Sequence, residues 1–345
     1  MGAVNASCFE PKTPVELFRG GVAECLREGG AAWVTAFAIL LAPTLLAVAG
    51  QYLIWQSGAG GFMETMRKGP MNPQTTDTGE LLGAIAIMVG VGAVTGILSV
   101  LANYAGGVAV ARMMAERALG RVYRPAQAWD FVLGRAGKIA GGAFALLLVL
   151  IGAAVVGEIP GGIIGAIVAM GSGALKPGAS PPLITQLAPV ATMIPVLAAV
   201  AVYLVSMMAA TGIENLGGFA ALSRSWRLPA GQFVHVLSAI VLAGLAFVLP
   251  STVLGLLAQT SVAAHLRASL GAANGMLVLT APGAVLSLAL SPFMLAVQAA
   301  IYFDLRSRQR EEGFTPYALA VDLGGELPEG VTEPPPTADA SPDIS

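Results

Sequence analysis

Long apolar stretches alternate with short polar ones from about residue 31 to residue 303. Each apolar stretch provides the roughly 20 residues that an α-helix needs to cross a hydrocarbon core about 30 Å thick. A helix in a soluble protein buries only one stripe and does not need such length without charge. The pattern predicts six transmembrane helices: Ala31–Ile54, Leu81–Ala111, Ile139–Ile159, Leu187–Thr211, Phe233–Leu257 and Met276–Phe303.

Two of these spans have extensions. The second is long and is expected to continue beyond the membrane as Arg112–Leu119. The third is followed, after Pro160, by the apolar segment Gly161–Met170. Because proline removes a helical hydrogen bond, this segment is a kinked continuation, a re-entrant segment or an interfacial helix.

Amphipathic segments precede the first, third and fifth spans. Thr13–Glu28 begins with a capping box, Thr-Pro-Val-Glu, and then places apolar residues at helical spacing. Arg124–Lys138 and Gly217–Leu228 repeat this theme. The sequence therefore predicts an all-α membrane bundle with cytoplasmic amphipathic helices, arranged as three similar units of one interfacial helix and one transmembrane hairpin.

Lys and Arg residues set the expected orientation. With six spans, fourteen of the eighteen Lys and Arg residues fall on the side that carries both termini. Cytoplasmic loops carry the excess of positive charge in membrane proteins. Both termini are therefore expected in the cytoplasm, and the regular alternation supports the count of six.

Composition agrees with this class of protein. Hydrophobic residues make up 56% of the chain and charged residues only 11%, against about 25% charged in a typical soluble domain. The net charge of −2 does not suggest a nucleic-acid partner. Cys8 and Cys25 both precede the first span, where a cytoplasmic location keeps thiols reduced, so neither a disulfide framework nor a cysteine metal site is expected.

The domain organisation follows from the same pattern. Residues 1–12 are expected to be a flexible N-terminus and residues 13–310 the membrane helical domain. The character of the sequence changes from about Glu311, and Glu326–Ser345 is rich in Pro, Asp, Glu, Ser and Thr with almost nothing to bury. We therefore expect residues 311–345 to be an acidic, largely disordered cytoplasmic tail.

Candidate chemistry inside the membrane is sparse in the sequence. No acidic or basic residue stands in the middle of a predicted span, although such residues usually mark functional sites in transporters and intramembrane enzymes. Glu158 and Glu214 lie at span ends and are expected to keep their carboxylates in water. His235 and His265 lack ligand-spaced partners and are interpreted as ordinary hydrogen-bonded or solvated residues. We predict no catalytic, cofactor or metal site.

Uncharged polar residues and prolines leave two interpretations open. Prolines interrupt four spans and either free backbone groups for a substrate or only kink the helices. Asn103, Tyr104, Gln298 and Tyr302 lie near the cytoplasmic ends of spans two and six. They line a shallow inward-facing cavity or form hydrogen bonds between helices.

The most distinctive residues lie on the predicted cytoplasmic face. Asp304 ends the last span, where the helix dipole disfavours an anion, and a nearby arginine, Arg224 or Arg227, is a candidate partner. This face is predicted to form a structural lock or a lipid-phosphate site, unless its arginines serve only topology. The candidate cluster comprises Arg224, Trp226, Arg227, Asp304, Arg306 and Arg308.

Three segments carry a family resemblance. They are Thr13-Pro14-Val15-Glu16-Leu17, Ser225-Trp226-Arg227-Leu228, and Tyr302-Phe303-Asp304-Leu305-Arg306-Ser307-Arg308 with Glu312-Gly313-Phe314. The chain resembles the bacterial membrane-domain family named after glycerophosphoryl diester phosphodiesterase, and related multi-pass families of unknown function. The resemblance implies a helical membrane module that anchors an enzyme in some relatives. The phosphodiesterase chemistry of such relatives resides in a separate barrel of about 200 residues or more, for which this chain has no segment.

These observations favour a non-catalytic membrane scaffold, anchor or lipid-associated module in the cytoplasmic membrane of a bacterium. Its expected partners are the lipid bilayer and a membrane or cytoplasmic protein. The main alternative is a permease or exporter of an apolar or lipid-like substrate, which needs no charge inside the membrane. An intramembrane enzyme is the third possibility, and no acid–base pair supports it.

Overall fold

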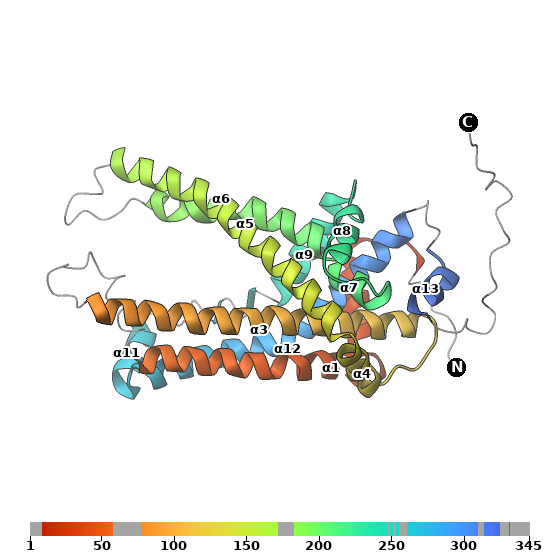
Figure 1. Cartoon of the computed structure of the whole chain (residues 1–345), viewed down its shortest axis with the longest axis horizontal. Helices are drawn as coiled ribbons and strands as arrows, with labels where there is room; N and C mark the ends of the chain where they lie inside the picture. Colours follow the sequence, from red (N-terminus) through yellow and green to blue (C-terminus); the bar gives the residue numbers. More distant parts are fainter. Residues whose placement is uncertain are drawn as a thin grey trace.

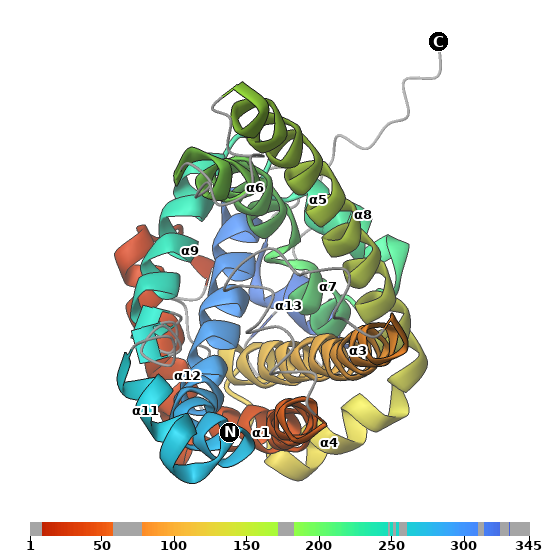
Figure 2. The same cartoon turned by 90° about the vertical axis from the view of Figure 1, so that its left-hand side faces the viewer.

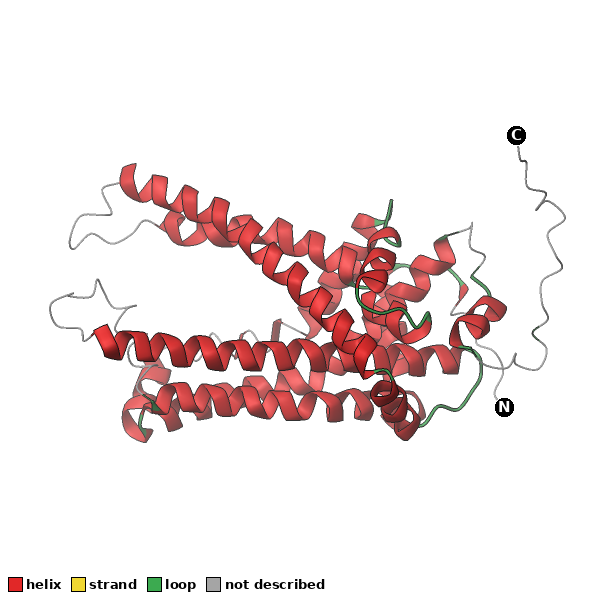
Figure 3. Cartoon of the chain, in the orientation of Figure 1, coloured by secondary structure: helices red, strands yellow, loops and turns green. Residues whose placement is uncertain are grey.

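The computed structural model describes residues 9–57, 78–171, 183–247, 249–250, 253–254, 261–309, 314–324 and 331. Within these ranges every regular element is a helix (Figure 3). In chain order the helices are α1 (Pro14–Gln56), α3 (Thr78–Ala118), α4 (Pro125–Gly134), α5 (Ala136–Gly171), α6 (Leu183–Leu204), α7 (Met207–Ile213), α8 (Phe219–Arg227), α9 (Phe233–Phe247), α11 (Ser261–Leu270), α12 (Ala272–Arg308) and α13 (Pro316–Leu323). The predicted all-α class is confirmed.

Five helical stretches are long and apolar enough to cross a membrane, which makes the chain a multi-pass membrane protein. They are Pro14–Gln56, Leu82–Ala118, Ala136–Val168, Ala191–Ile213 and Ala272–Arg308. Each contains most of one of the predicted spans. The predicted fifth span, Phe233–Leu257, is represented by the shorter apolar helix α9, which has 15 residues. Residues 248, 251–252 and 255–257 of that span lie outside the described residues.

The apolar segment after Pro160 continues the third span. α5 runs for 36 residues through Pro160 to Gly171, so Gly161–Met170 lies in the same helix. Of the three possibilities, the structure shows the helical continuation. Likewise α3 extends beyond the second predicted span to Ala118, as expected for Arg112–Leu119.

The expected order of a short amphipathic helical piece followed by an apolar helix occurs three times. Thr13 caps α1 through the predicted box, because its side chain accepts from the backbone of Glu16 and the Glu16 carboxylate accepts from the backbone of Thr13. Non-helical residues Arg27–Gly30 then separate this amphipathic piece from the span. Glu28, Gly29 and Gly30 all have positive φ there, which turns the chain sharply. α4 precedes α5, and α8 precedes α9, in the same manner.

The long helices form two arms that meet at one end. α1, α3 and α12 run side by side, whereas α5 and α6 form a hairpin that leans away from them (Figure 1). Figure 2, viewed along the bundle, places the hairpin opposite α1 and α12. α7 and α13 lie at the end where the arms meet, and α8 lies beside them. We call this the charged end, because it carries Glu214, Arg224, Asp304, Arg306 and Asp322. The opposite end is the far end.

Close helix contacts occur near the charged end both within the arm of α1, α3 and α12 and between the two arms. At Gly21 in α1, an added Cβ would lie 2.8 Å from the Cα of Val297 in α12. At Gly142 in α5, it would lie 2.3 Å from the hydroxyl of Tyr104, a fully buried side chain of α3. Only glycine permits these approaches, as is usual where transmembrane helices pack tightly.

Residues before and after the predicted membrane domain in the sequence also pack against it. Phe314 and the helix α13 pack into the core, with Leu319 fully buried. Phe9 contacts Phe314, with ring centroids 5.2 Å apart. The packed structure thus includes residues 314–324, which lie beyond the predicted end of the membrane domain at residue 310. α13 contains a single acidic residue, Asp322, and its apolar residues Leu319, Ala320 and Leu323 are buried.

Candidate functional site

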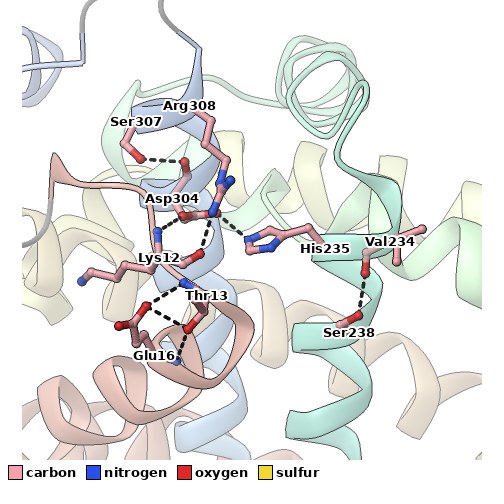
Figure 4. Close-up of polar contacts among 9 residues, drawn as sticks. All are labelled: Lys12, Thr13, Glu16, Val234, His235, Ser238, Asp304, Ser307 and Arg308. Atoms are coloured by element: carbon pink, nitrogen blue, oxygen red, sulfur yellow. Dashed lines mark hydrogen bonds and ion pairs between the residues drawn. The ribbon is translucent and has the colours of Figure 1, made fainter.

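Asp304 is the centre of a first group of contacts at the charged end (Figure 4). It lies one turn before the end of α12 and is only 2% exposed. Its carboxylate accepts from Arg308 Nε at 2.8 Å, from His235 Nε2 at 2.9 Å and from the backbone N–H of Lys12 at 2.6 Å. Arg308 also donates to the backbone carbonyl of Lys12 at 2.6 Å. We call these four residues the Asp304 clamp.

The Asp304 clamp corrects one prediction and supports another. A cation was expected to offset the unfavourable helix dipole, and one does. The cation is Arg308, one turn along the same helix, rather than Arg224 or Arg227. The clamp joins α12 to α9 and to the segment before α1, so it acts between distant parts of the chain.

Glu214, just after α7, organises a second group of contacts. It accepts from Arg224 Nε of α8 at 2.9 Å, and from the hydroxyl of Tyr302 on α12. Arg306 Nη1 lies 3.6 Å from Glu214 and is also ion-paired with Asp322 of α13. We call Glu214, Arg224, Tyr302, Arg306 and Asp322 the Glu214 network. The sequence-based expectation that the Glu214 carboxylate lies in water is wrong.

Burial affects the electrostatics of the Glu214 network. It raises the pKa of the Asp322 carboxyl above its ordinary value, against the lowering effect of Arg306. Two acidic and two basic side chains nevertheless lie together, so each charge has an opposite charge nearby. The Arg306 guanidinium also lies over the Phe314 ring, 4.7 Å from its centroid.

A third group of charges lies at the end of α3. Glu116, only 5% exposed, pairs with Arg112 at 2.8 Å and with Arg121 at 3.0 Å. Arg117 pairs with Glu28 at 3.1 Å, in the turn that interrupts α1. Arg112 also donates to the carbonyl of Leu323 at the end of α13. Arg112 and Arg117, which the sequence analysis counted toward membrane orientation, therefore also hold α3 against α13 and α1.

Trp226 and Arg227 lie apart from these buried groups, on the outer face of α8. Trp226 is 53% exposed and stacks on Tyr203, with ring centroids 4.4 Å apart. Arg227 is exposed and has no ion-pair partner among the described residues. With Phe219, Leu222 and Ser223 these two residues line a shallow hollow of about 310 Å³. We call these five residues the α8 outer face.

A deeper cavity of about 430 Å³ lies between α1, α3 and α12. Its polar lining consists of uncharged side chains: Thr44, Gln51, Ser99, Asn103, Thr280, Ser287 and Ser291. Of the four polar residues considered from the sequence, Asn103 lines this cavity. Tyr104 instead bonds Thr211 Oγ1 at 2.7 Å, and Tyr302 belongs to the Glu214 network. The sequence showed no sign that three spans would bring these hydroxyls together.

The six predicted cluster residues thus divide into three places. Asp304 and Arg308 belong to the Asp304 clamp, Arg224 and Arg306 to the Glu214 network, and Trp226 and Arg227 to the α8 outer face. Sequence reasoning missed Glu214 and Asp322. Thr315-Pro316 was a usable signal for the latter, because it repeats the Thr-Pro start of α1 and Thr315 caps α13.

In the part of the chain that the structure describes, no three His, Cys, Asp or Glu residues are grouped so that they could hold a metal ion. No protein-family model matches the chain, and searches of curated proteins and of solved structures found no match. The fold and its contacts define a multi-pass α-helical membrane protein.

Proposed function

We propose that this chain is a non-catalytic membrane scaffold that associates with lipid through the α8 outer face. The observation that carries the proposal is that most charged residues at the charged end form ion pairs within the protein, whereas Arg227 is exposed on the α8 outer face. Asp304, Arg308, Glu214, Arg224, Arg306 and Asp322 are used in contacts between segments of the protein. Such groups stabilise an arrangement of helices, and their charges are already balanced within the protein.

The α8 outer face supplies the lipid contact. Phe219 and Trp226 expose 66% and 53% of their surface, although both are large and apolar. Tryptophan is enriched at membrane interfaces, where its ring lies at the level of the head groups. An exposed arginine beside it suits a lipid phosphate, because the guanidinium donates two parallel hydrogen bonds.

The proposal also includes an orientation of the protein in the membrane and its membership of a protein family. The excess of Lys and Arg supports placing the charged end on the cytoplasmic side of a bacterial cytoplasmic membrane. The motif resemblance supports membership of the membrane-domain family named after glycerophosphoryl diester phosphodiesterase. A scaffold of this kind would hold a membrane or cytoplasmic protein close to the bilayer.

Arg227→Gln tests the lipid contact. We expect the wild-type protein to unfold at a higher temperature in nanodiscs that contain phosphatidylglycerol than in phosphatidylcholine alone, by roughly 2–4 °C. Arg227→Gln should lose most of this difference, because glutamine carries no charge for the phosphate. Arg19→Gln, the same change at an exposed arginine of α1, is the matched control and should keep it. Equal losses in both variants, or no effect of lipid on the wild type, would contradict the proposal.

A second candidate function is a permease for an uncharged, lipid-like substrate, and the cavity between α1, α3 and α12 favours it. Its volume of about 430 Å³ lies within the range of small-molecule sites. Flux across vesicles reconstituted with the purified protein distinguishes the two functions. A permease accelerates the release of a neutral amphiphile over protein-free vesicles, and Ala284→Phe, which fills the cavity, abolishes that acceleration. A scaffold leaves the release of the amphiphile at the rate of protein-free vesicles, with or without Ala284→Phe.

A further inference from the structure

Several hydroxyl groups in the cavity between α1, α3 and α12 use their protons within their own helices, so that their oxygen atoms remain as acceptors. The hydroxyl of Thr44 donates to the carbonyl of Leu40 at 2.8 Å, and that of Thr280 to Met276 at 3.0 Å. Ser291 donates in the same way to Ser287 at 2.7 Å. Each hydroxyl has one proton, which is thus used within its own helix. The oxygen lone pairs remain for a donor inside the cavity.

Asn103 adds to this balance. Its amide nitrogen donates to the carbonyl of Ser99 at 2.9 Å, so the amide oxygen is left to accept. The cavity therefore offers several acceptors within one small volume. A ligand that brings hydrogen-bond donors can use these acceptors.

The charge of the ligand is limited by the lining. The described residues around the cavity include no Asp, Glu, Lys, Arg or His. A phosphate or an ammonium group placed there would lose its hydration without gaining an opposite charge. Hydroxyl groups supply donors without this cost, so an uncharged hydroxyl-bearing head group fits best.

The shape of the cavity favours a molecule with an apolar chain. Its lining on α12 extends from Met276 to Ser291, which is about 22 Å along a helix. Ala47, Val48, Ala284 and Leu288 contribute apolar surface along this length. A compact polyol would leave most of that surface uncovered, whereas an acyl chain would cover it.

We propose that this cavity binds an uncharged amphiphile with free hydroxyls, of the monoacylglycerol or diacylglycerol type, with its head group at the end of the cavity that carries Asn103 and Ser291 and its acyl chain directed toward Met276. The site lies on α1, α3 and α12, whereas the proposed lipid-phosphate contact lies on α8. Either proposal can therefore fail while the other stands.

Photo-crosslinking in phosphatidylcholine nanodiscs tests the site. The two probes are dioleoylglycerol and dioleoylphosphatidate with the same photoactivatable acyl chain, so that they differ only in the phosphate. We expect adducts on Leu40–Gln51 and Met276–Ser291, with labelling by the glyceride about tenfold above labelling by the phosphatidate. Equal labelling of these segments by both probes would overturn the proposal.

Two variants relate the labelling to the cavity. Asn103→Leu with Ser291→Ala removes two acceptors at the head-group end and should reduce labelling by about tenfold, given the usual strength of two hydrogen bonds. Ser238→Ala is the matched control, because Ser238 donates to Val234 at 2.7 Å in α9, away from the cavity, and its loss should have no effect. Ala284→Leu fills the cavity without removing a hydroxyl. Its photo-labelling provides an independent measurement should the double variant fail to fold.

The remaining outcomes are also decisive. Labelling that persists unchanged in folded Ala284→Leu and in the double variant places the probe outside the cavity and overturns the proposal. Labelling abolished by an excess of free glycerol overturns the amphiphile and assigns the site to a soluble polyol. Labelling that survives glycerol and is lost in both variants supports the proposal as stated.

Discussion

Asp304→Asn should lower the free energy of unfolding by about 3 kcal/mol, the largest effect that we expect from a single substitution in this chain. Asparagine has nearly the same shape as aspartate and leaves the packing of α12 unchanged. It carries no charge, however, so Arg308 and His235 lose their shared anion at a position that is 2% exposed. The Lys12 backbone N–H also exchanges a charged acceptor for a weaker neutral one.

The measurement is equilibrium unfolding of the purified protein in mixed micelles with increasing denaturing detergent. Asp130→Asn is the control, since Asp130 is exposed on α4 and the same substitution there should change stability by less than about 0.5 kcal/mol. The double variant Asp304→Asn with Arg308→Gln should cost less than the sum of the single variants, because both remove the same pair. A strictly additive result would show that Asp304 and Arg308 do not interact.

Gly21→Ala should destabilise the protein by about 2 kcal/mol, although alanine is normally the better helix former. The added methyl group would meet the backbone of Val297 at 2.8–2.9 Å, so two helices must separate. Backbone atoms cannot rotate away as a side chain can. The contact between α1 and α12 is thereby loosened along its length.

Gly20→Ala is the matched control for this substitution. Its new Cβ would have nothing closer than the end of the Lys12 side chain at 4.0 Å. We expect this variant to be more stable than the wild type by up to about 1 kcal/mol, because alanine restricts the unfolded chain and favours the helix. Thermal unfolding of the two variants should therefore shift in opposite directions. A similar loss in both would mean that the α1–α12 approach is not the cause.

The spans and the helix starts were predictable because they depend on local properties. Twenty apolar residues must be helical in a bilayer wherever they pack. Thr13 and Glu16 cap a helix through contacts that span three residues, so the sequence alone contains both partners. Proline at the start of α1 and α4 marks the first helical turn in the same local way.

The partners of the charged residues were only partly predictable. Arg308 stands four residues after Asp304 on one helix, so their pairing follows from helical spacing and was overlooked in favour of a longer-range arginine. His235 and Lys12 reach Asp304 through tertiary packing, which no spacing rule provides. Glu214 follows α7 and contacts side chains of α8 and α12, so its partners also depend on tertiary packing. The cavity depends on the rotation of three spans about their own axes, and a single sequence does not specify that rotation.

The packing of α13 has a consequence for the synthesis of the protein. Phe314 contacts Phe9, and Asp322 and Leu323 contact Arg306 and Arg112, so segments translated before the first span and after the last span meet in one structure. The last span leaves the ribosome before α13 does, and the charged end cannot close until residue 323 has also emerged. Insertion and final assembly are therefore separate events in time. A nascent chain stalled between them would present Arg306 and Arg112 without these partners, which is a chemical difference that cellular quality control could detect.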